Sequence, residues 1–281
     1  MENRLWTIVC SSLPNCKINY RQRYTDRQIL LIQLWAVLHD RPICWACQSE
    51  HWPPEFRPRW LPHASTVSRR SWRAELAALL ESAHSKLRSL LGSQSRKAAI
   101  DGKPLLVSDY SRDPDARNGR AMRHFGRGYK LHAIIDEAGV VRSFDILSLN
   151  VQERKVAREL LLEVAPSIRR VVGDGNYDSG PLHKLLESTG LKLYTPLINN
   201  RAGPRTHPRR RRLARIMNSE IGHRLAHARE HIERQFGLLG NLGFGLKGLP
   251  NWVRRKHRVY RWVSCKLLLF HVWKLSKAND S

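Results

Sequence analysis

The chain has 281 residues, 42% of them hydrophobic, which is enough to fill the core of one large domain or two modest ones. Lysine and arginine total 49 against 24 aspartate and glutamate, and because the resulting net charge of +25 destabilises a compact protein, it favours a polyanionic partner over a basic surface without one. No apolar stretch approaches the roughly 20 residues of a membrane span and no secretory signal is evident, so we expect a cytoplasmic protein.

The five cysteines are an odd number and are expected to be reduced rather than to form a disulfide framework. Cys44 and Cys47 form a CxxC with His39 and His51 nearby, which is compatible with zinc. No second cysteine pair or spaced histidine pair completes a known type of zinc site. The sequence therefore favours ordinary buried thiols here.

Residues 1–95 are typical of a small helical domain. Thr25 and Asp26 can cap a helix over 29–38 that ends at Pro42, and the proline-rich stretch 50–63 predicts an extended connection. The sequence then changes from a helical to a strand-like pattern, and we place a domain boundary near residue 95.

A second helical region is expected over 65–91, with a basic start and an amphipathic alanine and leucine run after it. Its early arginines agree with a DNA-binding helix-turn-helix, and equally with a plain helical bundle that carries a solvated arginine face. As candidate DNA contacts we take Arg69, Arg70 and Arg73.

Residues 96–281 alternate strand and helix patterns, which predicts an α/β domain. A polar loop is expected over 108–127. Strands are expected at 98–107, 129–135, 140–149, 168–172 and 191–194, and helices at 151–164, 179–188, 216–239 and 253–273.

A basic segment at 196–215 separates the last strand from the long helix. Because its second half is rich in arginine and has no acidic residue, we expect it to be exposed, mobile and bound to DNA phosphates. Its candidate contacts are Arg201, Arg205, Arg209, Arg210, Arg211, Arg212 and Arg215.

Three carboxylates stand out in this domain. Asp101 interrupts an apolar strand, which is costly unless the side chain is paired or bound to a metal. Asp174 ends a buried strand, where open α/β sheets place their ligands, although a turn or helix-capping role is an equal alternative. On the long helix, Glu230 lies about 170° from the apolar stripe and Glu233 about 110°, so Glu233 is the candidate for the same site.

Arg229 lies four residues before Glu233 and could orient it or contact a phosphate, although an ordinary surface salt bridge is the alternative. Two aspartates and one glutamate suit magnesium or manganese rather than zinc. Two such ions about 4 Å apart can activate a water or a DNA 3′-hydroxyl and stabilise the departing oxygen.

From residue 100 to about 273 the chain resembles the DDE transposases of bacterial insertion sequences. The motifs occur in the family's order: Ile-Asp-Gly at 100–102, Gly-Tyr-Lys-Leu-His at 128–132, Gly-Asp at 173–174 followed by Tyr-Asp-Ser at 177–179, and Arg-Glu-His-Ile-Glu at 229–233. The chain departs from one branch of the family at Ala226 and Gly240, where that branch has Tyr and Lys, and at Asn176, where Gly is usual.

The resemblance implies a ribonuclease-H-like mixed sheet flanked by helices. It implies that Asp101, Asp174 and Glu233 bind two Mg²⁺ or Mn²⁺ ions, with Arg229 beside them, for DNA cleavage and strand transfer at insertion-sequence ends. The segment 61–70 is similar to the family's N-terminal DNA-binding segment. The expected partner is double-stranded DNA, both transposon end and target, bound by a homodimer.

Lys130 and His132 share one face of their strand. We take Lys130 as a DNA-contact candidate, whereas for His132 a packed position is at least as favoured as one lining the site. Two alternatives remain open, namely a nuclease that cuts without joining and a DNA-binding protein that has lost catalysis.

Overall fold

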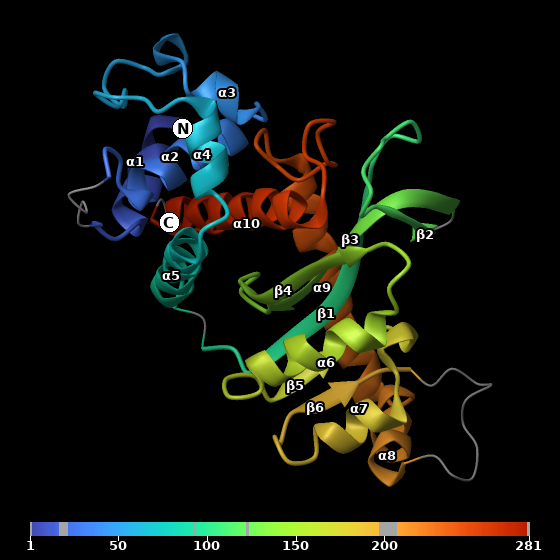
Figure 1. The fold of residues 1–281 in the computed structure, drawn as a ribbon. Coiled ribbons are helices and arrows are strands. Elements are labelled where there is room, and N and C mark those ends of the chain that lie inside the picture. The colour runs from blue at the N-terminus through green and yellow to red at the C-terminus, as the bar shows by residue number, and fades with distance from the viewer. Residues whose placement is uncertain (1, 17–21, 93, 122–123, 197–206, 280–281) are drawn as a thin grey trace. The chain divides into compact units, whose positions relative to one another are not determined.

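The computed structural model describes residues 2–16, 22–92, 94–121, 124–196 and 207–279, and it divides the chain into two compact units (Figure 1). We call Met1–Gly92, Leu242–Leu246 and Arg261–Ser281 the helical unit. Ser93–Asn241 and Lys247–Tyr260 form the sheet unit. No helix in the described part of the chain is both long and apolar enough to cross a membrane.

The helical unit begins with α1 (Glu2–Ser12) and α2 (Asp26–Leu38), and Thr25 and Gln28 form a reciprocal capping box at the start of α2. Short helices α3 (Ile43–Ala46) and η1 (Ser49–His51) lead into a stretch without regular structure. Then α4 (Ala64–Arg70) and α5 (Ala74–Leu90) replace the single helical region expected over 65–91.

Three tryptophans form the centre of this unit. The ring of Trp35 stacks on Trp52 at 4.6 Å and meets the edge of Trp6 at 4.8 Å. The indole N–H groups of the two stacked rings have partners, since Trp35 donates to the His51 carbonyl and Trp52 to the Ala46 carbonyl. Trp6, Trp35 and Trp52 are thus core residues.

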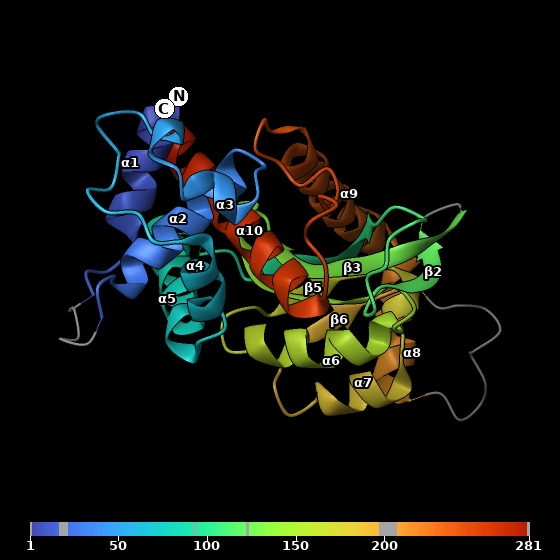
Figure 2. The same cartoon turned by 45° about the horizontal axis from the view of Figure 1, so that its top comes forward.

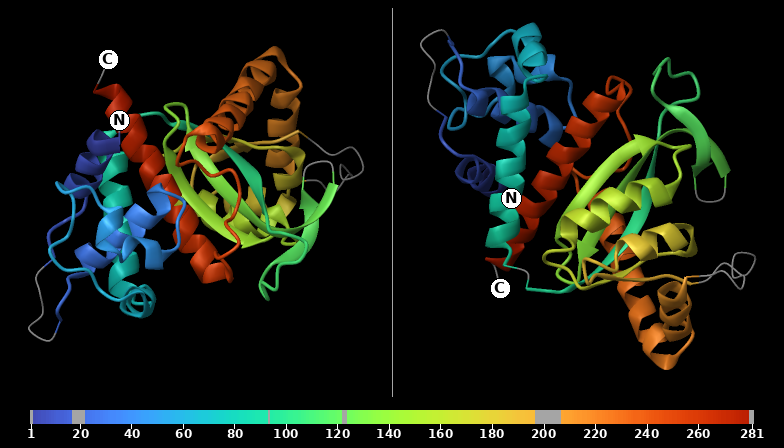
Figure 3. Two further views of the ribbon diagram at one scale, coloured as in Figure 1. Left: turned by 90° about the horizontal axis from the view of Figure 1, so that it is seen from above. Right: turned by 60° about the horizontal axis from the view of Figure 1, so that its bottom comes forward.

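The last helix, α10 (Lys256–Ala278), continues into the helical unit from residue 261. It runs beside α5 (Figure 3), where the buried His84 ring contacts the backbone and hydroxyl of Ser264 at 3.1 Å. The division expected near residue 95 lies close to Gly92, but the range 261–281, which holds most of α10, was expected in the second domain. Its buried face, which includes Leu267 and Phe270, places it in the helical unit instead.

The sheet unit contains a six-stranded mixed sheet in the order β2-β3-β1-β5-β6, with β4 also paired to β3. The strands are β1 (Lys97–Leu106), β2 (Arg117–Ala121), β3 (His124–Asp136), β4 (Val141–Ser148), β5 (Arg170–Val172) and β6 (Lys192–Tyr194). β1 is antiparallel to β3 and parallel to β5, and β5 is parallel to β6. The predicted α/β class is confirmed as a mixed sheet flanked by helices.

The hairpin β2–β3 lies where the sequence predicted a polar loop over 108–127. β2 and the first residues of β3, 124–128, contain few apolar residues but carry glycines at points of close backbone contact. A Cβ on Gly128 would lie 2.3 Å from the Leu105 carbonyl oxygen, and one on Gly119 would lie 2.5 Å from that of Leu149. Hydrophobic alternation could not reveal strands built in this way.

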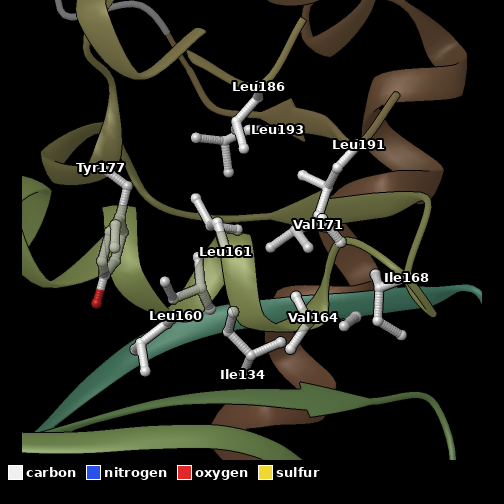
Figure 4. Close-up of a cluster of buried hydrophobic side chains, with 14 of the residues drawn as sticks. Ile134, Leu160, Leu161, Val164, Ile168, Val171, Tyr177, Leu186, Leu191 and Leu193 are labelled. Atoms are coloured by element: carbon white, nitrogen blue, oxygen red, sulfur yellow. The ribbon is translucent and has the colours of Figure 1, made fainter. Parts of the chain in front are cut away.

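Alternate residues of β5 point to opposite faces of the sheet. Val171 packs with α6 (Glu153–Val164) and α7 (Gly180–Leu185) in the cluster of Figure 4, whereas Val172 packs with Leu213 of α8 (Pro208–Met217). Figure 2 shows α6 and α7 on one side of this sheet and α9 (Glu220–Asn241) on the other.

The helix predicted over 216–239 begins later, because α8 ends at Met217 and α9 starts at Glu220. The hydroxyl of Ser219 donates to the Ile216 carbonyl at 2.7 Å. The backbone of Gly222 lies close to the end of α8, because a Cβ at this position would be only 2.2 Å from the Met217 carbonyl oxygen. Residues 208–215 of the segment expected to be exposed and mobile are helical, whereas Arg201 and Arg205 lie outside the described residues.

Candidate active site

Asp101 lies near the middle of β1, opposite Ala133 of β3. Its neighbour Ile100 belongs to the core cluster on the α6 face, so Asp101 points to the face that α9 covers. The Gly102 N–H donates to Asp101 Oδ1 at 2.8 Å. Burial raises the pKa of Asp101 to about 6, partly offset by this hydrogen bond and increased by the nearby Asp174.

Asp174 follows β5 and caps the short helix η2 (Gly175–Tyr177). Asn176 holds both carboxylate oxygens, since its backbone N–H donates to Oδ1 at 2.9 Å and its Nδ2 donates to Oδ2 at 3.0 Å. The residue that replaces the family's usual glycine therefore orients the second aspartate. Asp174 caps a helix, as one of the interpretations weighed from the sequence had it, and it also lines a pocket.

The two glutamates of α9 have different surroundings. Glu233 accepts from Arg229 Nη2 at 3.2 Å, and its side chain is 56% exposed. Glu230 instead pairs with His227 at 3.1 Å between Oε2 and Nδ1. Only Glu233 of the two lines the pocket that contains the aspartates.

This pocket has a volume of about 1190 Å³, and all of its lining residues belong to the sheet unit. Its lining includes Asp101, Asp174, Glu233 and Arg229, so the structure brings the four predicted residues to one cavity. Across the described chain, no three His, Cys, Asp or Glu side chains form a group that could hold a metal ion. The carboxylates therefore surround a space and do not form a closed cage.

A fourth carboxylate, Glu153, lines the same pocket and was not predicted. It is the first residue of α6, and its Oε1 accepts from Lys130 Nζ at 2.6 Å. Its other oxygen is buried and has no hydrogen-bond partner among the residues that the structure describes. An acidic residue in the first turn of a helix is common on surfaces, so its sequence position alone gave no sign of this role.

Gly102 provides the space for Lys130 to reach Glu153. A Cβ at position 102 would lie 2.7 Å from Lys130 Cδ and 3.2 Å from its Cγ. The side chain of Lys130 thus crosses the glycine to form the ion pair, in which both side chains are 15% exposed. Gly102 lies opposite His132 in the sheet, and Lys130 is two residues before His132 on β3. The Lys130 side chain therefore passes over position 102 and requires a glycine there.

His132 is fully buried and does not line the pocket. Burial lowers its pKa to about 3, with a smaller contribution from Lys130, so the ring is neutral at physiological pH. Its Nδ1 lies 3.3 Å from the Tyr177 hydroxyl, which is itself in the core cluster. Of the two interpretations weighed from the sequence, the packed strand residue is correct.

The predicted DNA contacts differ in exposure. Arg210 is buried and holds Asp178 through both carboxylate oxygens, and Arg70 is buried against Asp26 and the Tyr24 carbonyl, so an exposed position is wrong for these two. Arg209 is half-buried and donates to the Leu191 carbonyl. The exposed candidates among the described residues are Arg69, Arg73, Arg211, Arg212 and Arg215.

Residues 92–265 match the family model of the transposase DDE domain. No curated protein matches the chain in sequence. Among solved structures, the chain is similar to the piggyBac transposase in a cryo-EM synaptic complex with hairpin DNA, with 12% identity and a TM-score of 0.36. The match covers 77% of this chain, which spans only 53% of that one.

Proposed function

The chain belongs to the transposase DDE domain family, and from this premise we propose that it cleaves DNA at the ends of an insertion sequence and joins those ends to target DNA. Asp101, Asp174 and Glu233 are the proposed catalytic carboxylates. The single observation that carries the proposal is that these three side chains, from β1, the end of β5 and α9, line one pocket in a protein of net charge +25.

We propose a ribonuclease-H-like core for the sheet unit. The support is the strand order, in which the antiparallel strands β4, β3 and β1 continue into the parallel strands β5 and β6. The first proposed aspartate lies on the central strand of this arrangement and the second follows the strand beside it.

The pocket's donor set fits divalent magnesium or manganese. All the proposed ligands are carboxylate oxygens, and burial together with the nearby Asp174 raises the pKa of Asp101, so a divalent cation would favour its ionised form. Asp101, Asp174 and Glu233 would hold the ions. Bound there, two ions would supply Lewis acidity to the attacking and departing oxygens of an in-line displacement.

Other side chains of the pocket have positioning roles in this proposal. Asn176 fixes the rotamer of Asp174, and Arg229 holds Glu233 toward the cavity. The Lys130 ammonium neutralises Glu153, which lowers the negative potential that a DNA phosphate meets at this pocket. The proposed partner is double-stranded DNA, both transposon end and target, bound by a homodimer.

The test uses a supercoiled plasmid that carries the DNA flanking the gene on both sides. We expect nicking or excision with Mg²⁺ or Mn²⁺ and none with EDTA, and we expect precut ends to be joined to a second plasmid. Cleavage without joining would identify a nuclease instead. DNA binding with no cleavage in either metal would contradict the proposal and identify a derivative that has lost catalysis.

Replacing Gly102 by alanine is expected to slow cleavage roughly tenfold or more, because the added methyl group displaces Lys130 and leaves Glu153 unpaired in the pocket. The melting temperature should also fall, because the largely buried Glu153 carboxylate loses its ion pair, so the cleavage rates are compared well below the unfolding transition. The matched control is Gly180→Ala, where a Cβ meets nothing within 4 Å. Single-turnover cleavage rates equal to wild type for both variants would contradict a role for the lysine.

A further inference from the structure

The helical unit has a strongly basic pocket of about 440 Å³, lined by Gln22, Arg23, Tyr24, Thr66, Arg69, Arg70 and Arg73. Four of its seven lining residues are arginines and none is acidic, so its potential is positive and suits an anion. Arg23, Arg69 and Arg73 are exposed. The fourth arginine is different, because Arg70 is buried in its ion pair with Asp26 and forms part of the pocket's structure.

An exposed aromatic side chain lies beside this pocket. The guanidinium of Arg23 lies over the Trp60 ring at 5.5 Å from its centroid, and that of Arg59 lies over the same ring at 5.7 Å. Trp60 is nevertheless 56% exposed, and it comes from a proline-rich stretch without regular structure. A tryptophan held by two arginines and open to solvent is arranged for a partner that presents both negative charge and a flat apolar surface.

We infer that this pocket and Trp60 form a nucleotide-binding site for DNA, separate from the carboxylate pocket. Arg23, Arg69 and Arg73 each contact one of a set of neighbouring backbone phosphates, and Trp60 packs against the sugar or base of an adjoining nucleotide. The inference rests on the proposed function only in taking DNA as the polyanion. It adds Arg23, Arg59 and Trp60 to the DNA contacts considered from the sequence and removes Arg70 from them.

The two parts of the site have separable signatures in binding. A phosphate contact displaces condensed counterions, so each lost contact reduces the slope of log K against log salt concentration by about 0.9. A stacking contact displaces no counterions and leaves the slope of log K against log salt concentration unchanged. Its loss reduces affinity at every salt concentration by at least about fivefold.

The experiment measures fluorescence anisotropy of the full chain with a short labelled duplex that carries single-stranded ends, in EDTA, over a range of salt concentrations. The triple variant R23Q/R69Q/R73Q is expected to reduce the salt slope by roughly 3. Arg41→Gln is the charge control, because Arg41 is exposed in the same unit but does not line the pocket. It should change the slope by well under one.

For the aromatic part, Trp60→Ala should weaken binding at least about fivefold at an unchanged slope, and Trp60→Phe should retain most of the affinity. Trp72→Ala is the matched control, since Trp72 is also 56% exposed. Equal effects of the Trp60 and Trp72 variants, or a triple variant that keeps the wild-type slope, would overturn the inference. Because EDTA prevents metal-dependent cleavage, these outcomes are independent of whether the protein cuts DNA.

Discussion

Glu233→Gln is expected to reduce metal-dependent DNA cleavage by on the order of a thousandfold, because it removes one of the three proposed metal-binding carboxylates at the pocket. DNA affinity in EDTA should remain at the wild-type level or rise slightly, since a negative charge near the phosphates is lost. The same change at Asp101 or Asp174 should give the same pattern.

Glu230→Gln is the matched control for this prediction. It lies on the same helix, has a similar exposure of 63%, and pairs with His227 outside the pocket. Its cleavage rate should stay within about twofold of wild type. An inactive Glu230 variant beside an active Glu233 variant would reverse the assignment, and full activity of both would exclude α9 from the catalytic site.

Breaking the buried ion pair between Asp178 and Arg210 is expected to destabilise the sheet unit by about 3–5 kcal/mol, because either single change leaves an uncompensated buried charge. Asp178 is 1% exposed and receives Arg210 Nε on Oδ1 at 2.8 Å. His183 Nε2 lies 3.7 Å from the same oxygen, and Thr195 also contacts it. The pair therefore joins the loop after Asp174 to α7, α8 and the end of β6.

The measurement is denaturant unfolding of Asp178→Asn and Arg210→Ala, followed by far-UV circular dichroism and tryptophan fluorescence. The control is Glu220→Gln, which breaks the exposed Arg224–Glu220 pair and should cost less than about 0.5 kcal/mol. An unfolding free energy near wild type for the Asp178 variant would show that the pair is not structurally important.

The same pair should make stability depend on acid. Burial alone raises the pKa of Asp178, but the hydrogen bonds from Arg210 and the proximity of His183 outweigh it and lower the pKa to about 2. Because the pKa of Asp178 is lower in the folded protein than in the unfolded chain, where it is about 4, the ion pair contributes its full stabilisation above about pH 4. This contribution is lost as the pH falls from about 4 toward 2. The Asp178→Asn variant should lose this part of the acid dependence.

The three proposed catalytic carboxylates could be selected from the sequence because each has a local signal. Asp101 interrupts an apolar strand, Asp174 ends one, and the phase of the apolar stripe on α9 separates Glu233 from Glu230. These signals depend only on neighbours along the chain. The sheet and most helices were predictable for the same reason.

What could not be predicted depends on partners far away in the chain. Arg210 looks like every other arginine of its run until the fold places Asp178 beside it, and Glu153 looks like an ordinary first-turn acid until Lys130 reaches it across Gly102. The hairpin β2–β3 and the break before α9 depend on glycines in close backbone contact, which leave no hydrophobic period.

The central claim is that Asp101, Asp174 and Glu233 form one site for divalent metal. Crystals soaked in Mn²⁺ and measured at the manganese absorption edge test it most directly, because anomalous scattering locates the ions without reference to activity. The account predicts manganese peaks in the pocket, bounded by Asp101 and Asp174, that vanish in the double variant D101N/D174N. Manganese found only at other sites, such as the histidines of α9, with none at the two aspartates, would contradict it.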